Sequence, residues 1–359
     1  MTLPEIRKKI DALDTQLLAL LNQRADLVHE VGVLKQRDGV AIYAPEREEQ
    51  LLRSLAEKLA QQGGRLPESA IRAIYREIIS ASYALEKGLT IAYFGPEATN
   101  THQAARQKFG ASVVYEPQLS ITDVFHAVSR RKADYGVVPI ENSTEGAVTH
   151  TLDVLSDSEL KICAQVLLKI ENHLVAKIPR DQIRKIYSHP QVFGQCRTWL
   201  RGHFPHADLI EVSSTPRAAE IAAREPDGAA ITGPMAAEVY GLNILESSIQ
   251  DIANNTTRFL VVGHDTCPPT GRDKTSLMFI VQDKPGALFS ALEPFQRLKI
   301  NMSKIESRPS KRKAWEYFFF VDAEGHAKDA PLAEALAELG KHCTFVKILG
   351  SYPQPPAGD

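Results

Sequence analysis

The sequence is poor in several features that would point to particular classes of protein. Its four cysteines, Cys163, Cys196, Cys267 and Cys343, are scattered and form no C-x-x-C pair, which argues against a structural zinc site and suits a reducing cytosol. A net charge of −2 without a basic tract makes nucleic acid or an anionic membrane a poor candidate partner. No apolar run approaches the length of a membrane span, and no secretory leader opens the chain. We therefore expect a soluble, cytoplasmic protein that binds neither nucleic acid nor membrane.

Signatures of common cofactor and catalytic sites are also missing. We find no Gly-rich phosphate loop, no cluster of metal ligands and no defensible Ser-His-Asp order. We therefore expect no metal and no cofactor. What the chain does have is 359 residues with 43% hydrophobic content, which is enough for two or three packed domains.

The first 88 residues show helical spacing of apolar residues. Over Pro4–Gln36 the apolar positions recur every three or four residues, while Arg24 fills the one gap in the stripe and Lys35 lies near its axis. Two more helices are predicted over Pro45–Gln61 and Pro67–Lys87. The two cations are explained either by a buried ion pair or snorkelling side chains, or by a pocket for a small dianion. A helix of over thirty residues, about 50 Å long, is too long to bury its stripe alone, so we expect a second copy of the chain as its partner.

The segment Leu3–Lys87 resembles the all-helical chorismate mutase family, whose members are intertwined dimers of three-helix chains. The resemblance implies a pericyclic rearrangement of chorismate to prephenate, which needs no nucleophile and gains from a folded substrate and complementary charge. It implies that arginines clamp carboxylates, that Lys35 faces the breaking ether bond and that Arg7 reaches into the partner's site. The pocket residues implied by the match are Arg7, Arg24, Lys35, Arg47, Glu48, Ser82 and Glu86.

Two positions depart from the best-known bacterial pattern of this family. Ala44 stands where an Asp is found, so it is assigned no role. Glu86 stands where some members have Gln, and a carboxylate must be protonated before it can donate a hydrogen bond. We therefore expect mutase activity to fall as pH rises, and Glu86→Gln to flatten that dependence.

Beyond Gly88, short apolar runs alternate with helical patterns in two series, which predicts a two-lobed α/β domain over residues 89–266 with a cleft between the lobes. The stretch Val137–Gly146 is typical of these strand ends: the apolar run is expected to break at Pro139, and a helix to begin at Ala147. Its polar residues are explained either as a helix cap or as ligand-binding groups at the carboxyl edge of a sheet. Because several strand ends are built this way, we predict a site for a small anion.

Four motifs of this domain resemble the prephenate dehydratase family: G-P-E-A-T, P-I-E-N-S-T-E-G, S-H-P-Q and N-T-T-R-F, in order and at family spacing. The resemblance implies loss of the ring hydroxyl and ring carboxylate from prephenate, giving phenylpyruvate, CO2 and water. It implies that Thr257 serves the departing hydroxyl and that Arg258 holds a carboxylate. Ala98 replaces a glycine of the first motif, from which we expect no positive φ there. The substrate-binding residues implied by the match are Thr99, Glu141, Asn142, Ser143, Ser188, His189 and Gln191.

After a linker at Cys267–Gly271, residues 272–352 show a β-α-β-β-α-β pattern, which predicts a ferredoxin-like fold. One interpretation of this domain is a structural or dimerising appendage. The motifs G-A-L and E-S-R-P resemble the ACT regulatory module. This resemblance implies a site for L-phenylalanine at an interface. A helix that begins at a glycine has free N–H groups, which suit the carboxylate of such an amino acid. The tail Pro353–Asp359 is expected to be disordered. The implied effector residues are Gly286, Ala287, Leu288, Glu306, Ser307 and Arg308.

The three resemblances together match one bifunctional family, with a helical domain at 1–88, a dehydratase domain at 89–266 and an ACT domain at 272–352. They imply chorismate and prephenate as substrates, L-phenylalanine as feedback effector, and a homodimer or a tetramer of two dimers. Two alternatives stay open. One is a small-molecule sensor with binding-protein-like lobes and no turnover; the other is a dehydratase whose helical domain is kept only for dimerisation.

Overall fold

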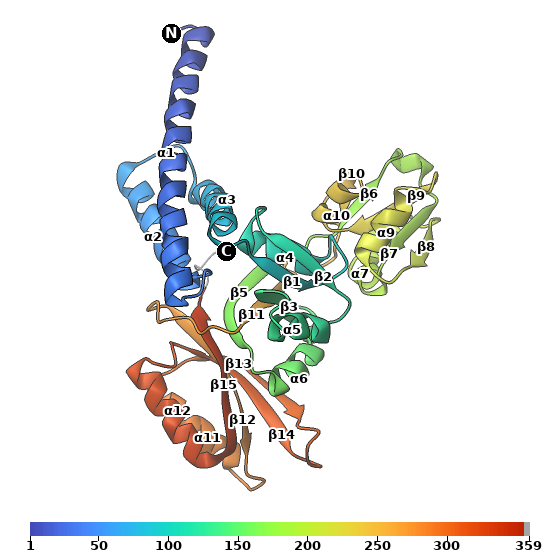
Figure 1. The fold of residues 1–359 in the computed structure, drawn as a ribbon. Coiled ribbons are helices and arrows are strands. Elements are labelled where there is room, and N and C mark those ends of the chain that lie inside the picture. The colour runs from blue at the N-terminus through green and yellow to red at the C-terminus, as the bar shows by residue number, and fades with distance from the viewer. Residues whose placement is uncertain (355–359) are drawn as a thin grey trace. The chain divides into compact units, whose positions relative to one another are not determined.

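The computed structural model describes residues 1–354, and Figure 1 shows its elements. The chain divides into two compact units. A helical unit comprises Met1–Leu89 with Phe109–Val114, and an α/β unit comprises Thr90–Lys108 with Tyr115–Asp359. Within the described residues, no helix is both long enough and apolar enough to cross a membrane.

The helical unit contains the three predicted helices, α1 (Leu3–Asp38), α2 (Pro45–Gln62) and α3 (Glu68–Glu86). A capping box begins α1, because the Thr2 backbone N–H donates to the Glu5 carboxylate at 2.7 Å. The apolar stripe of α1 stays uncovered in one chain: Leu13, Leu17, Leu20 and Leu27 are 56–63% exposed. A row of exposed leucines on one helix face is typical of a surface that another helix covers.

Helices α1 and α3 approach closely where α1 has a glycine. A Cβ atom on Gly32 would lie 3.1 Å from the Cα atom of Glu86, closer than most real Cβ contacts. The missing side chain therefore lets the end of α3 lie directly against α1. This contact places Glu86 beside Lys35, one turn further along α1.

The first part of the α/β unit, called lobe 1, is a sheet in the order β2-β1-β3-β11-β5, with β4 paired to β3. Strand β1 is parallel to β3, and β11 lies antiparallel between β3 and β5. Helix α5 is capped by the Ser120 hydroxyl, which accepts from the Asp123 N–H. Lobe 1 comprises β1 (Thr90–Phe94), α4 (Asn100–Phe109), β2 (Val114–Gln118), α5 (Ile121–Ser129), β3 (Tyr135–Asn142), β4 (Gly146–Ala147), α6 (Thr149–Asp157), β5 (Lys161–Lys169) and β11 (Thr256–Gly263).

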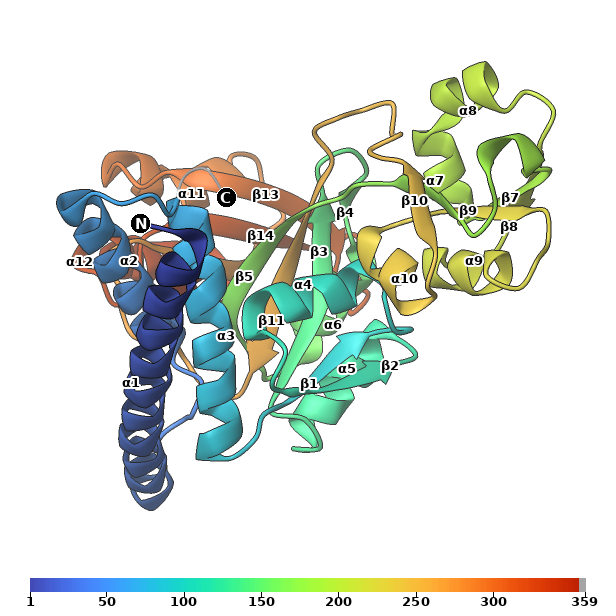
Figure 2. The same cartoon turned by 90° about the horizontal axis from the view of Figure 1, so that it is seen from above.

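The second part, lobe 2, has a separate sheet in the order β10-β6-β9-β7-β8 (Figure 2). The chain crosses from lobe 1 to lobe 2 after β5 and returns before β11. Residues 190–203 form two short helices, α7 and α8, that meet at Cys196. Lobe 2 comprises β6 (His173–Ala176), η1 (Arg180–Gln182), β7 (Lys185–Ser188), α7 (Pro190–Gln195), α8 (Arg197–His203), β8 (Asp208–Glu211), α9 (Thr215–Ala222), β9 (Gly228–Thr232), α10 (Pro234–Val239) and β10 (Asn243–Glu246).

The C-terminal domain has the predicted β-α-β-β-α-β order and a four-stranded sheet, β13-β14-β12-β15. Helices α11 and α12 lie side by side on one face of this sheet (Figure 1), where Phe279, Phe295 and Leu339 form a buried core. Strand β15 continues through Pro353, so the predicted disordered tail does not begin there, and residues 355–359 lie outside the described residues. The domain comprises β12 (Asp273–Val281), α11 (Ala287–Arg297), β13 (Met302–Pro309), β14 (Tyr317–Glu324), α12 (Ala330–His342) and β15 (Cys343–Pro353).

The other face of the C-terminal sheet packs against lobe 1. Met278, Phe320 and Leu349 belong to the same buried core as Leu152 and Leu260 of lobe 1. At the edge of this contact a Cβ atom on Gly350 would lie 2.2 Å from the carbonyl oxygen of Ile162 in β5. The two sheets therefore share one core, and glycine is needed where their backbones meet.

The prediction for the stretch after Tyr135 was wrong in two respects. Strand β3 does not break at Pro139 but continues to Asn142. The pairing with β11 shifts between Arg258 and Phe259, which leaves Ile140 as an extra residue, and such a bulge accommodates a residue without an N–H. The chain then turns back as β4, and α6 begins only at Thr149, so Ser143 and Thr144 do not cap a helix.

Gly350→Ala is expected to lower the free energy of unfolding by about 1–3 kcal/mol, because the new methyl group forces β15 away from β5. Gly340→Ala in α12 is the matched control, since a Cβ atom there meets nothing within 4 Å. Thermal unfolding and limited proteolysis of the full-length variants measure the effect. Equal melting temperatures for Gly350→Ala and the wild type would contradict the close approach of the two strands.

Candidate functional site

The helical unit brings together four of the residues predicted to line a dianion pocket. The Arg24 guanidinium Nη1 donates to the Ser82 hydroxyl at 2.6 Å, and the Lys35 ammonium pairs with the Glu86 carboxylate at 3.0 Å. Lys35 also donates to the carbonyl of Ile42 at 2.8 Å. Both cations are thus held in fixed positions on the α1 surface that faces α3.

The remaining predicted residues of this pocket differ in their placement. Glu48 is buried and accepts a hydrogen bond from the Tyr83 hydroxyl, a partner that the sequence reasoning missed. Arg47 and Arg7 are exposed. Arg7 lies seventeen residues before Arg24 on the same helix, which is about 25 Å at 1.5 Å per residue. Arg7 therefore cannot share a small pocket with Arg24 of its own chain.

In lobe 1 the paired strands β3 and β11 bring two predicted site residues together. Asn142 lies opposite Thr257 in the antiparallel register. Its side-chain NH2 group donates to the Thr257 hydroxyl and to the side-chain amide oxygen of Asn255, both at 2.7 Å. Because Thr257 accepts this bond, its own hydroxyl hydrogen is available for donation. Asn255 was not singled out from the sequence, although it stands two residues before Thr257 in the same motif.

The turn after β3 also holds the side-chain oxygen of Asn142. The Asn142 side-chain oxygen accepts from the Thr144 N–H at 2.9 Å and from the Glu145 N–H at 3.2 Å. Ser143 bonds to the first residue of β11, since its hydroxyl accepts from the Thr256 N–H at 3.0 Å. Asn142 is therefore fully bonded and held in a single orientation.

The structure does not place Arg258 beside Thr257. Successive residues of a strand point to opposite faces, so Arg258 and its register partner Glu141 lie on the face opposite Thr257 and Asn142. There the guanidinium pairs with the Glu141 carboxylate at 2.8 Å and with the Asp322 carboxylate of the C-terminal domain at 2.5 Å. Its other terminal nitrogen donates to the Tyr352 hydroxyl at 2.7 Å. The predicted substrate carboxylate would have to compete with these partners.

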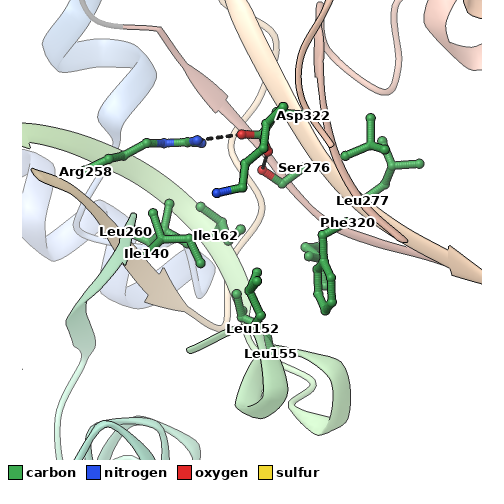
Figure 3. Close-up of a pocket in the computed structure, with 13 residues that line it drawn as sticks. Ile140, Leu152, Leu155, Ile162, Arg258, Leu260, Ser276, Leu277, Phe320 and Asp322 are labelled. Carbon is green, nitrogen blue, oxygen red and sulfur yellow. Dashed lines mark hydrogen bonds and ion pairs between the residues drawn. The ribbon is translucent and has the colours of Figure 1, made fainter. Parts of the chain in front are cut away.

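Figure 3 shows Arg258 directed at Asp322 and Ser276. These residues line a cavity of about 20 Å³ whose other walls are mostly apolar. Lys304 of β13 completes the group by donating to the second oxygen of Glu141. Burial alone would raise the pKa of Glu141, but the hydrogen bonds from Lys304 and Arg258 outweigh burial and lower it. Glu141 is therefore ionised at neutral pH, and its pairing weakens only as the pH falls through that lowered pKa.

Lobe 2 contributes fewer free polar groups than the sequence predicts. Ser188 is fully buried, and its hydroxyl donates to the Ile231 carbonyl at 2.8 Å. His189 caps α7, with its Nδ1 atom accepting from the Gln191 N–H at 3.3 Å. Gln195 at the end of α7 contacts the other lobe, because its amide donates to the Glu145 carboxylate at 2.9 Å. The β3–β4 turn is therefore the place where the lobes touch beside the Asn142–Thr257 pair.

The first motif shows that the expectation for Ala98 was wrong. Ala98 has φ 63°, a left-handed conformation that costs a non-glycine residue about 1–2 kcal/mol. The cost is offset by its surroundings: Ala98 is buried, and its N–H donates to Nδ1 of His102 at 3.1 Å. The His102 ring stacks on Tyr93 at 4.4 Å between centroids. His102 thus fixes the loop that carries Thr99, and the sequence reasoning did not single it out.

The two predicted effector motifs of the C-terminal domain lie on different elements. Gly286 precedes α11 with φ 78°, a conformation that glycine adopts without strain; Ala287 is buried and Leu288 is half-buried. Glu306 and Arg308 lie on the more buried face of the edge strand β13, and Ser307 lies on its exposed face. The Arg308 guanidinium is 3.4 Å from the Asp153 carboxylate of α6.

Three family models match the chain in order. Chorismate mutase type II matches residues 6–87, prephenate dehydratase residues 91–267 and the ACT domain residues 275–341. The bifunctional chorismate mutase/prephenate dehydratase of Aquifex aeolicus is 47% identical over 355 residues, which is 98% of each chain. That of Neisseria gonorrhoeae is 44% identical and covers 97% of this chain and 96% of its own. The chain belongs to the bifunctional chorismate mutase/prephenate dehydratase family.

Solved dehydratases resemble the α/β unit. Prephenate dehydratase from Arthrobacter aurescens, solved in complex with L-Phe, has a TM-score of 0.69 and 36% identity, and the match covers 74% of this chain and 90% of that one. The enzyme from Staphylococcus aureus gives a TM-score of 0.66 and 30% identity over 74% of this chain and all of its own. The helical unit is therefore a chorismate mutase domain, lobes 1 and 2 form a prephenate dehydratase domain, and the C-terminal domain is an ACT domain.

Dehydratase activity is expected to depend on neutral His102, because only neutral imidazole can accept from the Ala98 N–H. Burial lowers the pKa of His102; nearby Glu97 opposes this, and Arg106 adds to it. Since the folded pKa is below the unfolded value of about 6.5, the contribution is complete above pH 6.5 and is lost as pH falls through the folded pKa. The measurement is kcat/KM for prephenate between pH 5 and 8, with a no-enzyme blank at each pH.

Two variants separate this role from general packing. Asn at position 102 keeps an acceptor that does not titrate, so His102→Asn is expected to retain activity and lose this acidic decline. His102→Leu leaves a buried N–H unbonded, at a cost of about 1–3 kcal/mol, and is expected to lower activity at every pH. An unchanged acidic decline in His102→Asn would assign the titration to another group.

Proposed function

We propose that the chain converts chorismate to prephenate in its mutase domain and prephenate to phenylpyruvate in its dehydratase domain, with L-phenylalanine as feedback effector. The observation that carries this proposal is the match, along 98% of the chain, to a relative that bears both activities in its name. The L-Phe in the Arthrobacter aurescens structure supports the effector, and the biosynthetic role suits the cytoplasm.

The mutase reaction needs a rigid, positively charged pocket. Arg24 and Lys35 supply two of its charges from α1, and Arg47 and Glu48 supply groups from α2. In the protein without substrate, the Arg24 guanidinium is hydrogen-bonded to the Ser82 hydroxyl and the Lys35 ammonium is paired with the Glu86 carboxylate. Substrate oxygens replace such contacts at little cost, and the folded substrate is then held for its rearrangement.

A homodimer completes this pocket. Arg7 is about 25 Å along α1 from Arg24 of its own chain, whereas an antiparallel second α1 would place its own Arg7 near Arg24. The exposed leucines of α1 give that partner a surface to cover. The edge strand β13 of the ACT domain offers a second surface for pairing, and with Gly286 to Leu288 it would hold the effector between chains.

The dehydratase reaction takes place beside the Asn142–Thr257 pair. The ring hydroxyl of prephenate leaves as water after protonation, the ring carboxylate leaves as CO2, and the electrons of the broken C–C bond complete the aromatic ring. Thr257 passes its hydroxyl proton to the departing hydroxyl and takes up a replacement proton from solvent, and the bond it accepts from Asn142 strengthens that donation. Thr99, Ser143, His189 and Gln191 contribute polar groups around the ring and the side chain. The Ser188 hydroxyl is already bonded within its own sheet, so this residue holds the strand end that carries His189.

Formation of phenylpyruvate from purified prephenate tests the central claim. We expect turnover that added L-phenylalanine suppresses, because the ACT sheet shares a core with lobe 1. Turnover unaffected by phenylalanine would remove the effector from the proposal. A folded protein without turnover would instead favour a sensor with two lobes.

Arg24→Ala is expected to lower chorismate turnover by roughly 10²-fold, because one preorganised charge is lost from the transition state. Arg37→Ala is the matched control, since Arg37 is on the same helix but exposed and paired with Asp38. If Arg24→Ala keeps wild-type turnover, or if the wild type has none, the helical domain serves only for dimerisation.

A further inference from the structure

Four charged side chains from two domains meet behind the catalytic face of lobe 1. Glu141 and Arg258 come from β3 and β11, and Lys304 and Asp322 come from the ACT strands β13 and β14. The Arg258 and Asp322 side chains are 7% and 6% exposed, and Lys304 is 13% exposed. Buried charges held by several partners have little freedom to rearrange, because each broken pair leaves a charge in a poorly solvating surrounding.

Hydroxyl groups of the ACT domain hold Asp322 and Arg258 in turn. The Ser276 hydroxyl donates to the Asp322 carboxylate and is 2.7 Å from the Tyr352 hydroxyl. Tyr352 accepts from Arg258 at 2.7 Å. Asp322 is therefore bonded on both sides, to the arginine of the neighbouring domain and to its own sheet. The position of the Arg258 guanidinium is set by the ACT domain as much as by β11.

The opposite face of the same two strands carries the reaction groups. Thr257 directly precedes Arg258, and Asn142 directly follows Glu141, so each reaction group shares a peptide bond with a member of the charged group. The register pairs Thr257 with Asn142 and Arg258 with Glu141. A shift of Arg258 or Glu141 therefore moves Thr257 and Asn142, which lie about 3.3 Å further along the strands.

We propose that Asp322 and Lys304 of the ACT domain are positioning residues for the dehydratase reaction, acting through Arg258 and Glu141 on the Thr257–Asn142 pair. This inference rests on the proposed function, in which Thr257 and Asn142 face prephenate. It gives the ACT domain a part in the basal reaction, separate from effector binding. Lys304 also lies two residues before Glu306 on the same face of β13, so the effector motif and the positioning residue share one strand.

Asp322→Asn tests the proposal, because it removes the charge and keeps the shape. We expect the dehydratase kcat to fall by roughly tenfold, since a small misplacement of a catalytic group is enough for such a loss, while KM for prephenate changes by less than about twofold. Lys304→Met is expected to act in the same direction. Mutase activity of the same chain is an internal reference and is expected to stay unchanged. Glu334→Gln, which removes an exposed ACT carboxylate paired with Arg297, is the matched control.

Hydrogen exchange followed by mass spectrometry gives a readout that does not depend on turnover. In both variants we expect faster exchange in peptides that contain Asn142 and Thr257, and no change there in Glu334→Gln. Wild-type kcat in both variants together with wild-type exchange would overturn the proposal. Equal loss of mutase and dehydratase activity with a lowered melting temperature would also overturn it, in favour of general destabilisation. A wild type without dehydratase turnover would refute the proposed function, while the exchange data would still decide whether the ACT residues hold the two strands.

Discussion

A buried arginine shared between two domains determines how the α/β unit is held together. A guanidinium does not lose its proton in a protein, so the charge of Arg258 has to be met where it lies. The two carboxylates that meet it, Glu141 and Asp322, belong to different domains. Separating the domains would leave one partner, and breaking a buried pair typically costs about 3–5 kcal/mol. The ACT domain is therefore part of the environment that the dehydratase sheet needs.

The charges of the helical unit are arranged for a different purpose. The Lys35 side chain is 21% exposed, and Arg24 is bonded to a neutral hydroxyl. These contacts keep the cations in place but satisfy them only in part. A ligand with carboxylates can displace them, whereas a ligand at Arg258 would have to displace two ion pairs, one of them with the buried carboxylate of Asp322. The difference in burial separates charges that can bind substrate from charges that support the fold.

Most of the fold could be predicted from sequence, because its signals are local. The three helices of the mutase domain and the β-α-β-β-α-β succession of the ACT domain follow from apolar spacing and turn residues. The predicted ends of the three helices lie within a few residues of those in the structure. Pro139 shows the limit of such reasoning. A proline favours a strand end, but the extra residue Ile140 lets β3 continue, and a bulge depends on the partner strand, which local sequence does not identify.

The sequence predicted candidate site residues from motifs at strand ends, but not how they are arranged. The structure places Asn142 opposite Thr257, in the paired strands β3 and β11. The partners of Arg258 could not be predicted, since Asp322 is more than sixty residues away in sequence and meets it only through docking of two sheets. The positive φ of Ala98 was not predicted, because residue propensities contain no information about the hydrogen bond from its N–H to His102. That bond helps to offset the cost of the left-handed conformation.

The alternation of side chains along β11 has an evolutionary consequence. Thr257 and Arg258 are neighbours in sequence, yet Thr257 faces Asn142 and Arg258 faces the ACT domain. Deletion or insertion of a single residue near them would exchange the two faces, placing a buried cation beside Asn142 and a hydroxyl among unmatched carboxylates. A substitution at one of these positions leaves the other face in place, whereas a change of length would disturb both faces at once.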